Sequence, residues 1–378
     1  MRKLRMGQVG GGADGFIGAV HRTAACLDLR NEFVAGAMCA DPDEAIESGR
    51  DLGLADDRNY RTWQEMLEAE SKREDRIDFV SIVTPNDTHF PIAKAFIEKG
   101  FNVFCEKPMV HASTQAEELR ALVQEHDVVF AVTYNYSGYP MVKQARELVA
   151  SGAIGEVRKV VVEYNQGWLA TKLEETGQKQ ASWRTDPARS GLGGCIGDIG
   201  SHCEQLVSYI TGLEIEEICA ELSTFVEGRR LDDDANLLVR FRSGARGLLF
   251  ASQICVGNEN DLRIRVWGTK GGLEWHQENP NHLVMKRLGE PEVVMRRGND
   301  YLGKAAASFT RLPSGHPEAF FEAFANVYRA ASDAIRAKAG ANGGATFDYP
   351  DISHGARGVR FIEKAVESAR NGAAWTTI

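Results

Sequence analysis

The feature that most constrains the fold is an alternation of strand-like and helix-like segments over the first third of the chain. Strands joined by helices of 10–15 residues form parallel β-α-β units with right-handed crossovers. Short apolar runs occupy residues 4–9, 33–39, 77–83, 101–105 and 128–132, and helical patterns lie between them at about 17–29, 43–52, 89–99 and 114–125. The pattern predicts a doubly wound α/β domain of the Rossmann type over residues 1–132.

The pattern changes after residue 133. A helical segment at 141–150 precedes strand-like runs at 157–164, 215–225, 235–241, 247–253, 262–267 and 283–286, and helical patterns return at 317–338 and 351–370. Glycine-containing segments at 243–245 and 269–272 are typical of hairpin turns. Because 378 residues exceed one ordinary core, we predict a second α/β domain at 133–378, with a large, mostly antiparallel open sheet. Its C-terminal helices can pack back on the first domain, and residues 339–345 form a short linker.

Composition excludes several classes of protein. The chain has 44 basic and 53 acidic residues, a formal charge of −9, which argues against a general affinity for nucleic acid or anionic membranes. The sequence starts without a secretory signal pattern and has no apolar run long enough to span a membrane. Seven dispersed cysteines, an odd number, indicate reduced thiols, so we expect a cytoplasmic protein.

The first strand-like run leads into the glycine-rich segment Val9–Gly18. Gly10, Gly12 and Gly15 satisfy G-x-G-x-x-G, and Gly18 is an alternative last glycine if the loop is wider. A pyrophosphate needs close approach of bare backbone and the free N–H groups of a helix N-terminus. Because a strand precedes the motif and a helix follows it, we interpret it as a dinucleotide site. In the wider loop, the backbone at Phe16 and Ile17 also meets the phosphates.

Asp41 follows the second strand-like run, about 23 residues beyond Gly18. A carboxylate at this point can accept hydrogen bonds from the adenosine ribose and would repel a 2′-phosphate. The next residues are Pro42, Asp43 and Glu44, with no arginine among them, so the sequence favours NAD over NADP. Asp41 as a helix N-cap before Pro42 is compatible with the same geometry.

Two further turns follow predicted strands at the edge where open α/β sheets bind ligands. They are Thr84-Pro85-Asn86, with His89 shortly after, and Glu106-Lys107-Pro108. Either turn alone is unremarkable, and a lysine at such a position is often a solvated charge. Here Pro108 rigidifies the turn and Glu106 lies beside the lysine.

A glycine-rich segment in the second domain leads into a predicted helix that contains Asp198 and His202. If the helix starts near Asp198, these residues are four apart and share one face, and Gly212 ends the helix. An N-capping aspartate with a surface histidine is the structural alternative. Because the pair has no convincing third ligand, we expect no metal.

Together these motifs resemble the Gfo/Idh/MocA family of NAD(P)-dependent oxidoreductases, named for glucose-fructose oxidoreductase, inositol dehydrogenase and a rhizopine-catabolism protein. The resemblance covers essentially the whole chain. The glycine loop followed by His21, the turns at Thr84 and Lys107, Trp183-Arg184 and the Asp198/His202 helix occur in family order. It implies a Rossmann domain, a second domain for substrate binding and oligomerisation, and dimers or tetramers built through the open sheet. The extra residues between Gly12 and Gly18 depart from the family loop.

The resemblance also implies roles for individual residues. Lys107 contacts the reacting hydroxyl, and His202, held by Asp198, is the acid/base. Lys107 could itself be the base, or could stay charged and stabilise the alkoxide, and the sequence leaves both open. Glu106 orients the nicotinamide or its ribose. The expected cofactor-binding residues are Gly10, Gly12, Phe16, Ile17, Asp41, Thr84, Pro85, Asn86, His89, Glu106, Lys107, Trp183 and Arg184.

Substrate recognition is expected from polar, aromatic and cationic side chains of the kind that bind sugars. The candidates are Lys107, Asn135, Tyr136, Trp168, Lys179, Arg184, Asp198 and His202. Each alone is often structural, but the cations permit an anionic sugar. We expect an NAD-dependent dehydrogenase of a small-molecule sugar or polyol. The alternatives are a glycosidase that uses NAD transiently, through oxidation at C3, elimination, water addition and re-reduction, and a non-catalytic NAD-binding regulator.

Overall fold

The computed structural model describes residues 2–340 and 347–378, and the chain divides into two compact units. Unit 1 comprises Met1–Asn135 and Phe320–Ala356, and unit 2 comprises Tyr136–Ala319 and Arg357–Ile378. This division differs from a single boundary after residue 132, because a late segment of the chain belongs to the first unit. Of the linker expected at 339–345, the part from residue 341 lies outside the described residues.

Unit 1 contains the predicted parallel sheet, with the strand order β2-β1-β3-β4-β5. Its strands are β1 (Leu4–Gly10), β2 (Asn31–Ala37), β3 (Phe79–Val83), β4 (Asn102–Cys105) and β5 (Phe130–Val132). From β1 the chain places β2 on one side, and then places β3, β4 and β5 on the other side. The topological switch point therefore lies between β1 and β3. Open α/β sheets bind ligands outside the carboxyl ends of their strands at such a switch point, so the fold itself locates the site in this unit.

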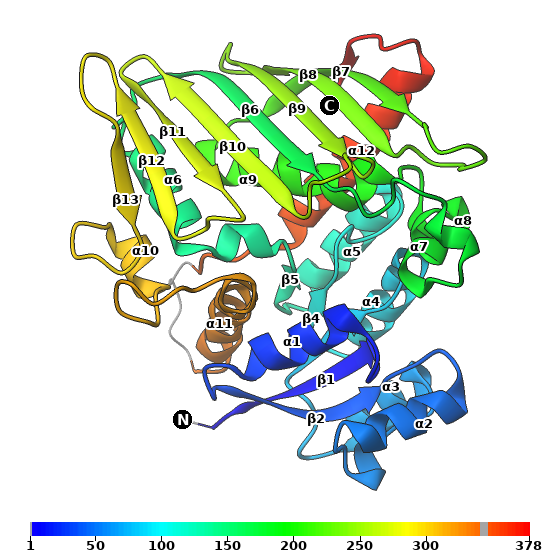
Figure 1. Cartoon of the computed structure of the whole chain (residues 1–378). Helices are drawn as coiled ribbons and strands as arrows, with labels where there is room; N and C mark the ends of the chain where they lie inside the picture. The colour runs from blue at the N-terminus through cyan, green and yellow to red at the C-terminus, as the bar shows by residue number, and fades with distance from the viewer. Residues whose placement is uncertain (1, 341–346) are drawn as a thin grey trace. The chain divides into compact units, whose positions relative to one another are not determined.

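Helices cover both faces of this sheet (Figure 1). They are α1 (Phe16–Cys26), α2 (Pro42–Asp51), α3 (Trp63–Lys72), α4 (His89–Glu98), α5 (Ser113–Glu125) and the late helix α11 (Phe320–Ala339). Helix α1 packs against α11, and α4 contacts both α3 and α5. The side chains of Phe324 and Tyr328 on α11 are buried in one core with Phe79 and Phe104 of the sheet. This shared apolar core explains why α11 belongs to unit 1.

Unit 2 is built on a nine-stranded sheet with the order β13-β12-β11-β10-β6-β9-β8-β7-β14. Its strands are β6 (Val157–Asn165), β7 (Ile215–Ser223), β8 (Asp234–Phe241), β9 (Arg246–Ser252), β10 (Asp261–Gly268), β11 (Gly271–His276), β12 (His282–Arg287), β13 (Val293–Arg296) and β14 (Thr376–Thr377). All neighbours pair antiparallel except β6 and β9, which are parallel. The predicted, mostly antiparallel sheet is therefore confirmed.

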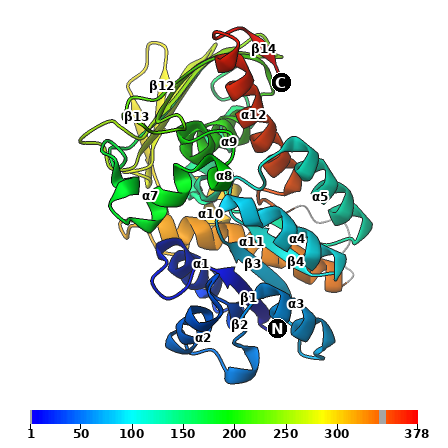
Figure 2. The ribbon, with the colours of Figure 1, turned by 90° about the vertical axis from the view of Figure 1, so that its right-hand side faces the viewer.

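Two helices, α6 (Pro140–Ala150) and α9 (Ser201–Thr211), pack against one face of this sheet (Figure 1). Helix α12 (Ile352–Arg370) runs toward β14 (Figure 2), where Ser368 Oγ accepts a hydrogen bond of 2.9 Å from the N–H of Ala220 on β7. Because these helices cover only one face, side chains along strand β8 alternate between buried and exposed. Leu237 and Val239 are buried, whereas Leu238 between them is 48% exposed. One face of the sheet is thus a core and the other is open.

Several short elements do not appear among the segments predicted from sequence. They are α3, the helices α7 (Lys179–Arg184), α8 (Pro187–Ser190) and α10 (Lys304–Ser308), and the strands β11, β13 and β14. Most are too short for periodicity to show. Strand β11 lies where the pattern predicts a turn: Gly271 and Gly272 already pair with β12, so the hairpin turn is confined to the residues just before them. Among the described residues, no helix is both long enough and apolar enough to cross a membrane.

A buried ion pair fixes the connection between β2 and β3. Glu70 on α3 is fully buried and takes two hydrogen bonds from Arg58, at 3.0 and 2.6 Å. It also accepts from the hydroxyl of Tyr60 at 2.9 Å and from the N–H of Ile77 at 2.9 Å. Four donors on one buried carboxylate tie α3 to the segments on either side of it.

We predict that Glu70→Gln lowers the free energy of unfolding by about 3 kcal/mol, because it leaves the Arg58 guanidinium without its buried counter-charge. Urea denaturation followed by circular dichroism measures this change. Glu68→Gln is the matched control, since Glu68 is an exposed partner of Lys72 on the same helix. Equal stability of the two variants would contradict a structural role for the buried pair.

Candidate functional site

The turn between β1 and α1 brings two glycines into direct backbone contact. Gly10 and Gly11 have φ angles of +79° and +63°, the left-handed region that favours glycine. A Cβ atom on Gly18 would lie 2.0 Å from the carbonyl oxygen of Gly11. A Cβ on Gly11 would lie 2.7 Å from Cα of Gly18. Only glycine allows the helix to start this close to the turn.

Two side chains donate hydrogen bonds to the backbone carbonyl oxygens of this turn. Gln8 Nε2 donates to the carbonyl of Gly10 at 2.9 Å, and Arg22 donates to that of Gly11 at 2.6 Å. Ser48 on α2 accepts from the N–H of Ala13 at 2.7 Å. With its carbonyls tied back and a helix N-terminus beside it, the turn has the form that accepts a pyrophosphate. The glycine cradle thus fits a dinucleotide.

Asp41 is the N-cap of α2. Its Oδ1 accepts from the N–H groups of Asp43 and Glu44, at 2.9 and 3.0 Å, and the residue is exposed. The N-cap alternative is therefore the arrangement that the structure shows. Both bonds use Oδ1, so the geometry leaves Oδ2 at the surface for a ribose hydroxyl.

The turn after β3 is held from inside by His89. A short 3₁₀ turn over Asn86–Thr88 leads into α4, and Thr88 Oγ1 donates to Thr84 Oγ1 at 2.7 Å. His89 is fully buried, and its two ring nitrogens lie 2.9 Å from the carbonyl oxygens of Pro108 and Thr84. Burial lowers its pKa. His89 therefore links the Thr84 turn to the Lys107 turn from the interior, and does not present its ring at the surface as a cofactor contact would require.

Glu106 and Lys107 directly follow β4, and the Lys107–Pro108 peptide bond is cis. Glu106 Oε1 lies 2.7 Å from Nε2 of His21 and also accepts from the hydroxyl of Thr133. Its Oε2 lies 3.3 Å from the N–H of Lys107. Burial opposes its charge, but His21, Lys107 and Thr133 together lower the pKa of Glu106 to about 2. The carboxylate is a fixed negative charge beside Lys107.

Asn135 follows β5 at the same carboxyl edge of the sheet. The residue is 2% exposed, and its Nδ2 is buried without a hydrogen-bond partner among the described residues. A buried donor left in this way costs about 1–3 kcal/mol unless water or a ligand accepts from it. Asn135 therefore has an amide donor to offer at the expected site.

In unit 2, Asp198 lies in a π-helical turn (Ile196–Gly200) that leads directly into α9. The helix thus begins before Asp198, which corrects the predicted start and excludes the N-cap alternative. Asp198 Oδ2 accepts from Gln253 Nε2 at 2.8 Å and lies 3.3 Å from Arg184 Nε. Gly212 ends the helix in the left-handed conformation, as predicted.

A second aspartate anchors the start of this turn. Asp232 is buried and accepts from the N–H groups of Gly194 and Ile196, both at 2.7 Å. Burial raises its pKa to about 6. The turn that carries Asp198 is therefore fixed at its first residues by the loop before β8.

The imidazole of His202 packs between aromatic rings. Its centroid lies 4.8 Å from that of Tyr136, nearly perpendicular at 77°, and 6.2 Å from that of Tyr164. The two tyrosine hydroxyls are 2.6 Å apart, and Tyr164 donates to Asn260 Oδ1 at 2.6 Å. Tyr136, expected to bind substrate, is 3% exposed and uses its hydroxyl within this network, so the structure makes it a support for the histidine.

The remaining candidates of unit 2 lie on less buried segments. Trp168 is half-buried and donates its ring N–H to Gln166 at 3.0 Å. Lys179 is exposed at the start of α7, and Trp183 lies near its end with Arg184 stacked on its ring at 4.1 Å. The structure brings Arg184 to Asp198, whereas Lys179 makes no such link within the described part of the chain.

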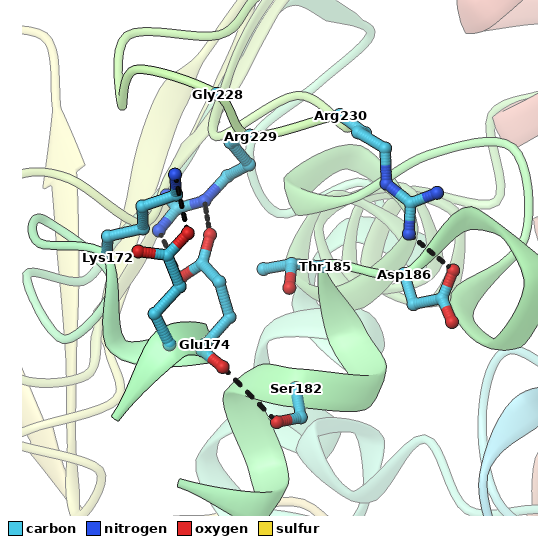
Figure 3. A pocket seen from close by; sticks show the side chains of 9 residues that line it. Lys172, Glu174, Ser182, Thr185, Asp186, Gly228, Arg229 and Arg230 are labelled. Atoms are coloured by element: carbon cyan, nitrogen blue, oxygen red, sulfur yellow. Dashed lines mark hydrogen bonds and ion pairs between the residues drawn. The ribbon is translucent and has the colours of Figure 1, made fainter. Parts of the chain in front are cut away.

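A polar pocket of about 270 Å³ lies beside α7 (Figure 3). Its buried Arg229 directs all of its donors inward, to Glu174, Asp233 and the carbonyls of Leu169 and Thr171. Arg230 pairs with Asp186 at 2.8 Å. Both cations are thus paired with carboxylates of the described residues, and these ion pairs stabilise the segment that carries Arg184. We therefore assign no anion site to this pocket.

Asp261, His276 and Glu278 place potential metal-ligand atoms within 4.8 Å of one another. Arg263 already donates to Asp261 Oδ1 at 2.7 Å, and Asn260 N–H donates to Glu278 at 2.9 Å. A guanidinium on the would-be ligand oxygen disfavours a second cation, so we assign no metal to this group.

Sequence reasoning missed the partners that hold the predicted residues. Gln253, Tyr164 and Asn260 in unit 2, and Ser81, Thr133 and Tyr328 in unit 1, are buried or half-buried polar residues in apolar surroundings. A polar residue at the end of an apolar strand run, as at Gln253, was the available signal. Which aspartate or histidine it would reach depends on the tertiary fold.

Comparisons with known proteins agree with this geometry. Residues 5–134 match the model described as "Oxidoreductase family, NAD-binding Rossmann fold", and residues 142–274 match the "GFO/IDH/MocA C-terminal domain". The chain is 36% identical over 379 residues to the uncharacterized oxidoreductase YfiI of Bacillus subtilis, covering 99% of this chain and 96% of that protein.

Solved structures are similar over the full length. An inositol dehydrogenase homolog from Azotobacter vinelandii, complexed with NAD⁺, has a TM-score of 0.97 at 36% identity, covering 100% of this chain and 98% of the other. The same homolog has also been solved with NADH and myo-inositol, with a TM-score of 0.94. An oxidoreductase from Sinorhizobium meliloti has a TM-score of 0.90 at 44% identity, with 99% of each chain covered. This chain belongs to the Gfo/Idh/MocA family of oxidoreductases and carries its NAD-binding Rossmann domain.

Proposed function

We propose that the protein is an NAD-dependent dehydrogenase acting on a carbinol of a cyclic polyol or sugar. The observation that carries this proposal is the turn after β4, where Lys107 lies beside the buried, ionised carboxylate of Glu106 in the NAD-binding unit. Support comes from the A. vinelandii homolog, which binds NADH and myo-inositol and is 36% identical over the whole of this chain.

The residues that would hold the cofactor follow the carboxyl edge of the parallel sheet. N–H groups near Gly10, Gly12, Phe16 and Ile17 would bind the pyrophosphate, and Asp41 the adenosine ribose, which favours NAD over NADP. Bound NAD supplies the nicotinamide C4 that accepts or returns a hydride. Around it we place Thr84, Pro85 and Asn86, with Glu106 toward the nicotinamide ribose. Trp183 and Arg184 remain proposed cofactor contacts.

His202 is the proposed acid/base. An imidazole titrates near neutral pH, and proton transfer of this kind contributes roughly 10²–10⁴-fold to a rate. Its ring is oriented by Tyr136 and Tyr164, while Asp198 is held by Gln253 and Arg184. We propose that Lys107 binds the substrate oxygen as a cation and stabilises the charge that develops there. Because a neighbouring negative charge favours the protonated form of a lysine, the fixed carboxylate of Glu106 favours this role over that of a base.

Substrate hydroxyls require donors and acceptors on rigid supports. Asn135 has a buried amide donor to offer, and Trp168 a half-buried ring of the type that stacks on sugars. Arg184, with Lys179 on the same short helix, would favour a substrate that carries a negative charge. Asp198, held in place by Gln253 and Arg184, is proposed to accept a hydrogen bond from a substrate hydroxyl.

The glycine turn can be tested by adding a single methyl group. Gly18→Ala should weaken NADH binding at least about tenfold, because the added methyl would displace the Gly11 backbone from the cradle. Titration of NADH fluorescence measures the affinity. Ala19→Ser, at the exposed neighbouring position, should bind NADH as the wild type does. Unchanged affinity in Gly18→Ala would remove the turn from the cofactor site.

The reaction itself can be tested with a panel of substrates. The protein, supplied with NAD⁺ and a panel of inositols, hexoses, sugar acids and aryl glycosides, should accumulate NADH with at least one polyol or sugar. Absorbance at 340 nm measures NADH, and colour release measures loss of the aglycone. Aglycone release without net NADH would instead identify a redox-neutral glycosidase, and NADH binding without turnover of any compound would favour a regulator.

Two variants test the site on the substrate found in this way. Lys107→Ala and His202→Asn should each lower kcat at least about 10²-fold while NADH affinity changes less than about threefold, since both act on the reacting oxygen. His282→Asn, a partly exposed histidine on β12, is the matched control and should retain wild-type kcat. Wild-type turnover in Lys107→Ala would show that the site assignment is wrong.

We also propose that two copies of the chain associate through the open face of the nine-stranded sheet. Leu238, Leu248 and Val161 are neighbours across β8, β9 and β6 and lie on the face opposite α9. Leu238 is 48% exposed there. Burial of such a row against a second copy removes apolar surface from water.

Leu238→Asp should therefore shift the protein to monomers, because it places a charge in that row. Size-exclusion chromatography with light scattering gives the mass. Leu288→Asp, at a 97% exposed leucine in the β12–β13 hairpin, should leave the mass unchanged. A monomeric wild type, or an unchanged mass in Leu238→Asp, would rule out this interface.

A further inference from the structure

A chain of buried hydrogen bonds in unit 1 ends at the carboxylate of Glu106. His21 on α1 is fully buried, with Nε2 at 2.7 Å from Glu106 Oε1 and Nδ1 at 2.7 Å from the hydroxyl of Tyr328 on α11. Ser81 Oγ on β3 lies 2.8 Å from the same hydroxyl. These residues lie far apart in the sequence, and the reaction proposed above uses none of them directly.

The ionised carboxylate of Glu106 determines where the hydrogen lies at one end of this chain. Because an ionised carboxylate only accepts, Nε2 of His21 carries the hydrogen and donates to Glu106. On the other side of the ring, Nδ1 lies 2.7 Å from the hydroxyl of Tyr328 and 3.2 Å from that of Ser81. These two hydroxyls therefore hold the ring from the interior while Nε2 faces Glu106.

The same residues also fix the backbone at the end of β4. The ring of Tyr328 stacks on Phe104, two residues before Glu106, with centroids 4.5 Å apart and an interplanar angle of 11°. Thr133 donates to Glu106 from the end of β5. Glu106 Oε2 meets the N–H of Lys107. The carboxylate is therefore held on three sides, and Lys107 is the next residue.

We propose that His21 and Tyr328 are positioning residues that clamp the Glu106 carboxylate and so fix the Lys107 turn for the reaction. This inference rests on the proposed function, because it assumes that Lys107 contacts the substrate. It assigns a role to α11: the helix supplies the Tyr328 hydroxyl that meets Nδ1 of His21 and so orients the ring. Besides its hydrogen-bond partners, the ionisable groups that act on Glu106 or feel its charge are Lys107, His89, Cys105 and Tyr328.

The test compares four variants. His21→Leu removes the donor to Glu106, whereas His21→Gln keeps an amide N–H near the position of Nε2. Tyr328→Phe removes only the hydroxyl. Tyr60→Phe is the matched control, since it also deletes one buried tyrosine hydroxyl of unit 1. That hydroxyl donates to Glu70 at 2.9 Å, away from Glu106. Tyr60→Phe and Tyr328→Phe should therefore lose similar stability.

The first readout needs no substrate. In protein labelled with ¹³C at the glutamate carboxyl, the Glu106 signal is assigned by its loss in Glu106→Gln. In the wild type and in Tyr60→Phe it should stay ionised down to about pH 3.5, consistent with a pKa of about 2. In His21→Leu its titration should move up by at least about one pH unit, because burial is then less well opposed, and His21→Gln should restore most of the shift.

The second readout is turnover. His21→Leu should lower kcat about tenfold or more and Tyr328→Phe about threefold or more, with NADH affinity nearly unchanged, because displacement of a reacting group by about 1 Å is costly. His21→Gln should recover most of kcat, and Tyr60→Phe should match the wild type. An unchanged Glu106 titration in His21→Leu, or a kcat no lower than that of Tyr60→Phe, overturns the clamp. Wild-type turnover in Lys107→Ala would overturn the proposed function instead, and the Glu106 titration would still decide whether the clamp exists.

Discussion

The site of unit 1 depends on how a buried carboxylate is kept charged. Glu106 lies in surroundings that oppose ionisation, yet donors from α1 and the end of β5 lower its pKa to about 2. Without these donors, burial would favour the neutral, protonated form of Glu106, and the negative charge beside Lys107 would be lost. Much of the surrounding core, including the stacking of Tyr328 on Phe104, positions these donors.

The glycine turn is the second constraint, and its origin is steric. The helix starts so close to β1 that a methyl group on Gly18 would overlap the carbonyl of Gly11. The Asp198 turn has a different origin, since Asp232 fixes its backbone and Gln253 and Arg184 fix its side chain. The position of each expected functional group is therefore fixed by neighbouring residues.

The sequence predicted the architecture well because strand and helix periodicities are local. The Rossmann strands, the Gly212 helix stop and the hairpin near Gly244 follow from neighbouring residues. Non-local features were harder. The sequence allowed the C-terminal helices to pack back on the first domain, but not the contacts of Phe324 and Tyr328 by which α11 does so, and the π turn shifts the helix start ahead of Asp198. Tyr136 and His89 have polar atoms suited to ligands, but tertiary contacts bury them. Their supports, Gln253 and Tyr164, cannot be recognised until the fold brings them together.

The central claim is that the protein moves hydrogen between a carbinol carbon and the nicotinamide of NAD. It is tested most directly with a polyol or sugar substrate deuterated at the reacting carbon, by mass spectrometry of the cofactor after turnover. The account predicts one deuterium per NADH, bound at C4, together with a slower reaction of the deuterated substrate. NADH that forms without the label, or a label that appears only in water, would contradict it.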